Sequence, residues 1–121
     1  MEKKQKKEIY NVDATGQVLG RMASQIAKML QGKETVGYER HILSGAKVNV
    51  INASKLKMTD KRKKETMHEK YSGYPGGLTY KNNEAIIAKK GYAELIRLAV
   101  YNMLPANRLR QPMMNNLKIT E

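Results

Sequence analysis

The chain has 121 residues, with 23 Lys and Arg against 11 Asp and Glu, which gives a formal net charge of +12 at pH 7. It contains no cysteine, which excludes a disulfide framework, a cysteine-ligated metal and a thiol nucleophile. No apolar run approaches the roughly 18–20 residues that span a bilayer. We therefore expect one soluble cytosolic domain over residues 1–121 that makes no membrane contact, with residues 1–8 as a basic tail rather than a secretory signal.

The first half of the chain predicts a strand, a helix and a second strand. The pattern over 9–14 is typical of a short strand. Apolar residues then recur at helical spacing over 19–30, and Gly32 suits the C-terminal cap of that helix. A second, largely buried strand is expected at 48–53. This order is that of a βαβ unit, which favours parallel pairing of the two strands with a right-handed crossover.

The second half of the chain predicts more helix than strand. The expected elements are a third strand near 66–71, a helix from Asn83 that Gly91 interrupts and Pro105 ends, a short helix from about Gln111, and an edge strand at 117–119. Asn83 is the candidate N-cap of the longer helix. The pattern as a whole indicates a small α/β domain with helices on a mostly parallel sheet.

The positive charge is clustered along the chain. Residues 55–64 hold six basic residues and one acid, and no acid lies between Glu94 and Glu121. A solvated surface explains any single cluster equally well. Three clusters on one small domain favour a polyanionic partner that neutralises the charge, and nucleic acid is the commonest.

Sequence motifs of enzymes are missing. No G-x-G occurs, and the only Gly-Lys pair, at 32–33, is followed by Glu34 instead of Ser or Thr. His68 begins a pattern like that of a zinc-protease helix, but Ser72 stands where the second His is required. We therefore expect no catalytic activity, no metal, no cofactor and no small-molecule substrate.

A glycine-rich segment at 73–77 is the most informative local feature. Glycines permit positive φ and close approach of the backbone, so that N–H groups can point at phosphate oxygens. A tight turn explains the glycines by themselves. Tyr71 and Tyr74 beside them, and the basic run at 61–64 before them, favour an RNA-binding loop.

Four motifs occur together in one order: NVDATGQVLGRMAS at 11–24, VINA at 50–53, SGYPGGL at 72–78 and AVYNMLP at 99–105. In this order and spacing the chain resembles the family of ribosomal protein thirteen of the large subunit, over about 9–119. The resemblance implies a three-layer α/β/α domain with a short, mostly parallel sheet of about four strands, and no enzymatic activity or cofactor.

The resemblance also implies partners and a role. The chain is expected to bind large-subunit ribosomal RNA beside neighbouring ribosomal proteins and to support early assembly, in a cytoplasmic or an organellar ribosome. Family members can also bind their own messenger RNA. Two alternatives stay open at this point: a free RNA-binding translational regulator outside any particle, and a small α/β enzyme that binds a nucleotide.

Three segments are expected to approach RNA by this resemblance: the glycine loop, the basic run before it and the region after Met-Leu-Pro. The residues carried over are Tyr71, Gly73, Tyr74, Gly76, Gly77, Lys61, Arg62, Lys63, Lys64, Asn107 and Arg108. Further RNA contacts are expected at Lys3, Lys4, Lys6, Lys7, Arg21, Lys55, Lys57, Lys70 and Arg110. The chain departs from the family at Tyr71, where a His is common, and at Arg110-Gln111, where the family has Gly-Arg.

Overall fold

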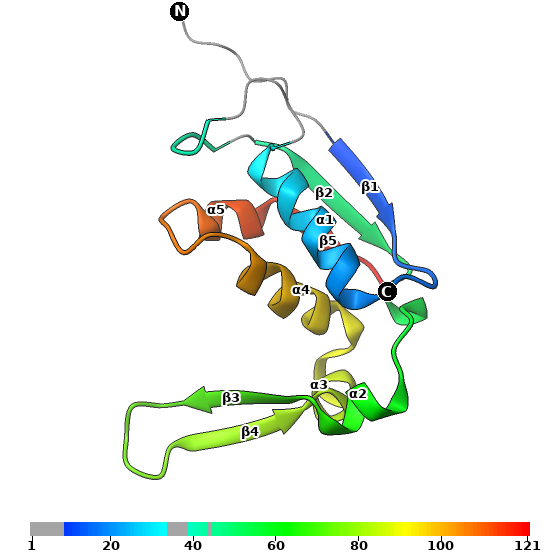
Figure 1. The fold of residues 1–121 in the computed structure, drawn as a ribbon, viewed down its shortest axis with the longest axis vertical. Coiled ribbons are helices and arrows are strands. Elements are labelled where there is room, and N and C mark those ends of the chain that lie inside the picture. The colour runs from blue at the N-terminus through cyan, green and yellow to red at the C-terminus, as the bar shows by residue number, and fades with distance from the viewer. Residues whose placement is uncertain (1–8, 34–38, 44) are drawn as a thin grey trace, which may run out of the picture.

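The computed structural model describes residues 9–33, 39–43 and 45–121. Its elements are β1 (Ile9–Asp13), α1 (Leu19–Gln31), β2 (Lys47–Ile51), the short 3-10 helix η1 (Ala53–Lys55), α2 (Asp60–Glu65), β3 (Met67–Tyr71), β4 (Leu78–Asn82), α3 (Asn83–Lys90), α4 (Tyr92–Met103), α5 (Arg110–Asn115) and β5 (Leu117–Ile119) (Figure 1). All the elements expected from the sequence are present. The structure adds η1, α2 and β4.

A three-stranded parallel sheet organises the larger part of the domain. Its strand order is β1-β2-β5, with β2 in the centre and both neighbours parallel to it. The predicted parallel pairing of the first two strands is therefore confirmed. β5 is an edge strand, as expected, and it brings the end of the chain back beside the first βαβ unit.

Helix α1 covers the buried face of this sheet because its apolar residues form one stripe. The buried members of the stripe are Met22, Ala23, Ile26, Ala27 and Leu30. Gly32 ends the helix in the left-handed conformation, with φ 78°, and its N–H donates to the carbonyl of Met29. That is the cap predicted from the sequence. Helix α4 packs beside α1, and Ile96 and Val100 complete the same core.

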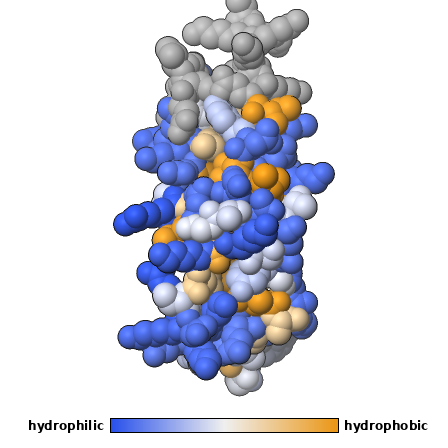
Figure 2. Space-filling view, turned by 90° about the vertical axis from the view of Figure 1, so that its right-hand side faces the viewer, coloured by the Kyte–Doolittle hydropathy of each residue, from blue (hydrophilic) through white to orange (hydrophobic). Residues whose placement is uncertain are grey.

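The other face of the sheet carries exposed side chains. Along β1 and β2 burial alternates, so that Val12, Val48 and Val50 are buried while Ile9 and Ile51 are 64% and 45% exposed. Hydrophilic residues dominate the side of the molecule that carries β1, with separate apolar patches between them (Figure 2). The α/β class and the mostly parallel sheet are confirmed. Over the described ranges the parallel sheet has three strands, where about four were expected, and two further strands form a separate antiparallel sheet.

The third predicted strand belongs to a separate hairpin. β3 pairs antiparallel with β4, and the two strands project from the rest of the domain (Figure 1). The hairpin leads directly into α3, which Gly91 separates from α4. The N-cap prediction at Asn83 is wrong by one residue. Asn82 caps α3, because its Oδ1 accepts from the N–H of Ala85 at 2.9 Å.

Candidate nucleic-acid interface

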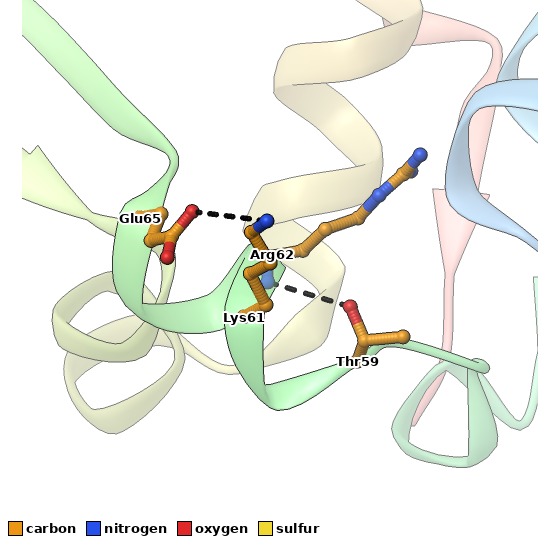
Figure 3. Close-up of polar contacts among 4 residues, drawn as sticks. All are labelled: Thr59, Lys61, Arg62 and Glu65. Carbon is orange, nitrogen blue, oxygen red and sulfur yellow. Dashed lines mark hydrogen bonds and ion pairs between the residues drawn. The ribbon is translucent and has the colours of Figure 1, made fainter.

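The basic run at 61–64 forms helix α2. Thr59 caps this helix, since its Oγ1 accepts from the N–H of Arg62 at 3.4 Å. Lys61 lies 4.0 Å from Glu65, one turn along the exposed surface. Figure 3 shows Arg62 extending away from that ion pair. Arg62, Lys63 and Lys64 occupy the last turn, where the helix dipole favours positive charge.

The four cations of α2 have different environments. Lys63 is half-buried, and its Nζ lies 5.8 Å from the centroid of the Tyr92 ring on α4. Lys61, Arg62 and Lys64 are exposed. Lys63 therefore contributes to packing between α2 and α4, whereas the other three are available to an anionic partner.

The β3–β4 hairpin has two chemically different faces. The register pairs Tyr71 with Leu78 and Glu69 with Tyr80, so both tyrosines share one face. Lys70 and Lys81 belong to the opposite face. Tyr80 and Lys81 were not among the predicted contacts. The alternation of residue types after the glycines was the signal that could have identified them.

The tip of the hairpin is a tight turn that requires glycine. The N–H of Gly77 donates to the carbonyl of Tyr74 at 2.9 Å, and Gly76 has φ 76°. With Pro75 second and Gly76 third, these are the features of a type II turn. The N–H of Gly77 is therefore used within the loop. Those of Gly73 and Gly76 donate to no acceptor in the part of the chain that the structure describes.

Tyr74 is the most exposed aromatic residue of the described chain. It lies at the hairpin tip and is 75% exposed, and Tyr71 at the base of the loop is 64% exposed. The hairpin thus presents aromatic rings, cations and unpaired backbone donors on one projecting element. Aromatic rings stack with unpaired bases, while cations and N–H groups bind phosphate.

The region after the Met-Leu-Pro motif contains one bound arginine and one free arginine. The guanidinium carbon of Arg110 lies 4.1 Å from the centroid of the Tyr101 ring, and Nη2 donates to the carbonyl of Leu104 at 3.0 Å. Asn107 Oδ1 accepts from the N–H of Leu109. Arg108 is exposed and has no partner within the described ranges. The geometry makes Arg110 a clamp on this loop and leaves Arg108 to face outward.

A further group of predicted cations lies around the start of α1. Arg21, Lys55 and Lys57 are exposed, and Lys57 forms a parallel bridge with Val18, the residue before α1. The predicted contacts at Lys3, Lys4, Lys6 and Lys7 lie outside the described residues.

Asp13, at the end of β1, is a structural carboxylate. Its Oδ1 accepts from the N–H and the hydroxyl of Thr15, at 2.9 and 2.7 Å. These two bonds, the backbone one foremost, lower the pKa of Asp13 below 3.8, and a hydrogen bond from Asn52 and the charge of Lys55 act in the same direction. The conspicuous VDATG stretch therefore organises a turn.

Within the described part of the chain, no three His, Asp or Glu side chains lie close enough together to hold a metal ion. None of the helices in that part is long and apolar enough to cross a membrane.

Comparison with known proteins gives a consistent result. A family model described as ribosomal protein L13 matches residues 7–121. The large ribosomal subunit protein uL13 of Natranaerobius thermophilus is 43% identical over 110 residues, which is 91% of this chain and 76% of that protein. The uL13 of Syntrophus aciditrophicus is 42% identical over 93% of this chain and 79% of its own length. That of Aquifex aeolicus is 44% identical over 89% and 74%.

Proposed function

Because the chain belongs to the ribosomal protein L13 family, it is a structural constituent of the large ribosomal subunit, and we propose that it binds large-subunit ribosomal RNA mainly through α2 and the β3–β4 hairpin. The family membership confirms the resemblance carried by the four sequence motifs. The proposed role is that of a scaffold in cytoplasmic ribosomes, without catalysis or a cofactor. Support of early assembly and binding of its own messenger RNA stay predictions.

The projecting hairpin carries the proposal. Tyr71, Tyr74 and Tyr80 are each more than half exposed, and their hairpin has no core of its own. Exposed aromatic surface of this kind marks an interaction site. Lys70 and Lys81 on the opposite face, together with the exposed cations of α2, favour a polyanion as the partner.

The chemistry divides between phosphate and base contacts. Lys61, Arg62 and Lys64 would neutralise phosphates and release counterions. The N–H groups of Gly73 and Gly76 would donate to phosphate oxygens, and the tyrosines would stack on unpaired bases. The parallel sheet and its helices hold the base of this interface rigid, since α3 continues directly from β4 into the helical layer.

Co-sedimentation tests this function against that of a free regulator. A tagged chain expressed in a bacterium should migrate with large ribosomal subunits in a sucrose gradient and stay with them through a moderate salt wash. Its matched control is a variant with Lys61, Arg62 and Lys64 changed to Gln, which should be depleted from the subunit fraction. Recovery of the unaltered protein at the top of the gradient, free of subunits, would contradict the proposal.

A further inference from the structure

A hollow of about 490 Å³ lies where α4, α5 and β5 meet. The residues that line it are Arg97, Leu98, Tyr101, Gln111, Met114, Asn115 and Leu117. None of these residues was expected to contact RNA from the sequence. The volume falls in the usual range for small-ligand sites and is large enough for one nucleotide.

The polar side chains around the hollow come in two pairs, each one helical turn apart. Arg97 and Tyr101 share one face of α4, and Gln111 and Asn115 share one face of α5. Leu98 and Met114 add apolar surface to the lining. The two helices therefore present a cation and an aromatic ring opposite two amides.

The side-chain amides of Gln111 and Asn115 together leave one hydrogen-bond acceptor and one donor group without a partner among the described residues. Gln111 Nε2 donates to Asn115 Oδ1 at 3.3 Å. Gln111 Oε1 and Asn115 Nδ2 then have no partner in the part of the molecule that is described. An acceptor beside a donor is the arrangement with which Asn and Gln bind the edge of a base.

The charge around the hollow favours an anionic ligand. No Asp or Glu occurs between Glu94 and Glu121, and Arg97 forms no ion pair with a described residue. Arg110, which does not line the hollow, stacks on Tyr101 with its guanidinium 4.1 Å from the ring centroid. This contact restrains the Tyr101 ring and places positive charge beside it.

We propose that the hollow holds one unpaired nucleotide of single-stranded RNA. The base lies against Tyr101 and the apolar surface of Leu98 and Met114, its edge meets Gln111 and Asn115, and a phosphate meets Arg97. This inference rests on the proposed function and adds a pocket for a base to the phosphate contacts of α2 and the hairpin.

Photocrosslinking locates the nucleotide directly. The probe is a hexauridylate in which each base is 5-bromouracil. It is mixed with the full chain and irradiated, and the protein is then digested with trypsin. Cleavage after Arg97 and Arg108 releases the peptide 98–108, which contains Tyr101, and cleavage after Arg110 and Lys118 releases 111–118. We expect crosslinks in these two peptides.

Matched variants test the side chains. Arg97→Gln and the double variant Gln111→Ala/Asn115→Ala should weaken hexauridylate binding about three- to ten-fold and reduce the crosslinks in proportion. Arg40→Gln and Gln25→Ala change exposed residues of the same types elsewhere and should have no effect. A melting curve checks that each variant is folded. If the double variant is unfolded, Arg97→Gln still tests the inference.

The outcomes separate the pocket from the general function. If the chain binds hexauridylate with crosslinks confined to 65–81, and the pocket variants bind normally, the inference of a nucleotide in the hollow is wrong. The proposal that the protein binds RNA is then retained. If uridine monophosphate competes at the concentrations at which the hexamer binds, the site is one for a free nucleotide and the inference is overturned. If the unaltered chain binds neither the hexamer nor large-subunit ribosomal RNA, the proposed function fails and the pocket with it.

Discussion

Asn83, the first residue of α3, accepts a hydrogen bond of 2.6 Å at its Oδ1 from Nε2 of His68 on β3. Its Nδ2 donates to the carbonyl of Arg62 on α2 at 3.2 Å. The amide is buried, with 4% of the residue exposed. A single side chain at the start of α3 is therefore hydrogen-bonded to both the basic helix and the hairpin.

Replacing this amide should loosen the interface more than the core. Asn83→Ala leaves the His68 ring without its partner and leaves the Arg62 carbonyl with the N–H of Thr66 alone, so we expect the free energy of unfolding to fall by about 1–3 kcal/mol. Urea denaturation measures this loss. Hydrogen exchange should quicken in β3 and β4 before it does so in β2.

The control for Asn83 is Asn49→Ala. Asn49 donates to Asn11 at 3.4 Å on the exposed face of the sheet, so its loss should cost less than about 0.5 kcal/mol. Equal stability of the two variants would show that the Asn83 bridge does not hold the hairpin.

The sequence was most informative where a pattern is local and one face is buried. The stripe of α1 and the Gly32 cap predict that helix within a residue, because apolar burial and cap geometry both depend on neighbours in the chain. The sequence analysis did not identify β4, because the alternation of residue types after the glycines extends over only five residues, none of which is buried. Helix α2 is six residues long, again with none buried, and appeared only as a run of charge.

The candidate site was partly predictable for the same reason. Cations, glycines and aromatic residues beside them can be chosen from residue type, and Arg62, Gly76 and Tyr74 are exposed in the structure, while their contact with RNA stays a prediction. The clamping role of Arg110 depends on Tyr101 and Leu104, which approach it only in the folded chain. The amide bridge of Asn83 likewise joins residues 15 and 21 positions apart, and nothing in the local pattern indicates it.

Substitutions at Gly76 should distinguish a turn requirement from backbone contact with RNA. Its φ of 76° is left-handed, and a Cβ there meets open space in the protein. Gly76→Val should therefore destabilise the hairpin through backbone strain, whereas Gly76→Asn should fold well, because Asn tolerates this conformation.

The measurement at Gly76 is incorporation into large subunits, with hairpin stability followed by hydrogen exchange. If the backbone touches RNA, both variants should be incorporated poorly although only Gly76→Val is strained. Normal incorporation of Gly76→Asn would show that the glycine serves the turn and nothing else.

The two arginines after the Met-Leu-Pro motif should have opposite phenotypes. Arg110→Gln removes the stacking on Tyr101 and the bond to the Leu104 carbonyl, so we expect about 1–3 kcal/mol less stability. Arg108→Gln should change stability by less than about 0.5 kcal/mol and weaken RNA binding. Urea denaturation and filter binding of large-subunit ribosomal RNA separate the two effects. A stable Arg110→Gln that binds RNA poorly would reassign Arg110 to the interface.

The salt dependence of RNA binding should report how many phosphates the exposed cations neutralise. If about six are contacted, the affinity for large-subunit ribosomal RNA should fall by about a thousand-fold between 50 and 200 mM salt. Changing Lys61, Arg62 and Lys64 to Gln removes three contacts and should lower the slope of log K against log salt by about 2–3. Lys63 is left in place because it packs on Tyr92.

The control for this slope loses the same charge elsewhere. Lys28, Lys89 and Lys90 are exposed on α1 and α3, and their change to Gln should leave the slope closer to that of the unaltered protein. If both triple variants lower the slope equally, the protein attracts RNA through its net charge, and α2 is no more a part of the interface than any other basic surface. A slope lowered by the α2 variant alone identifies that helix as a site of phosphate contact, because net charge is the same in the two variants.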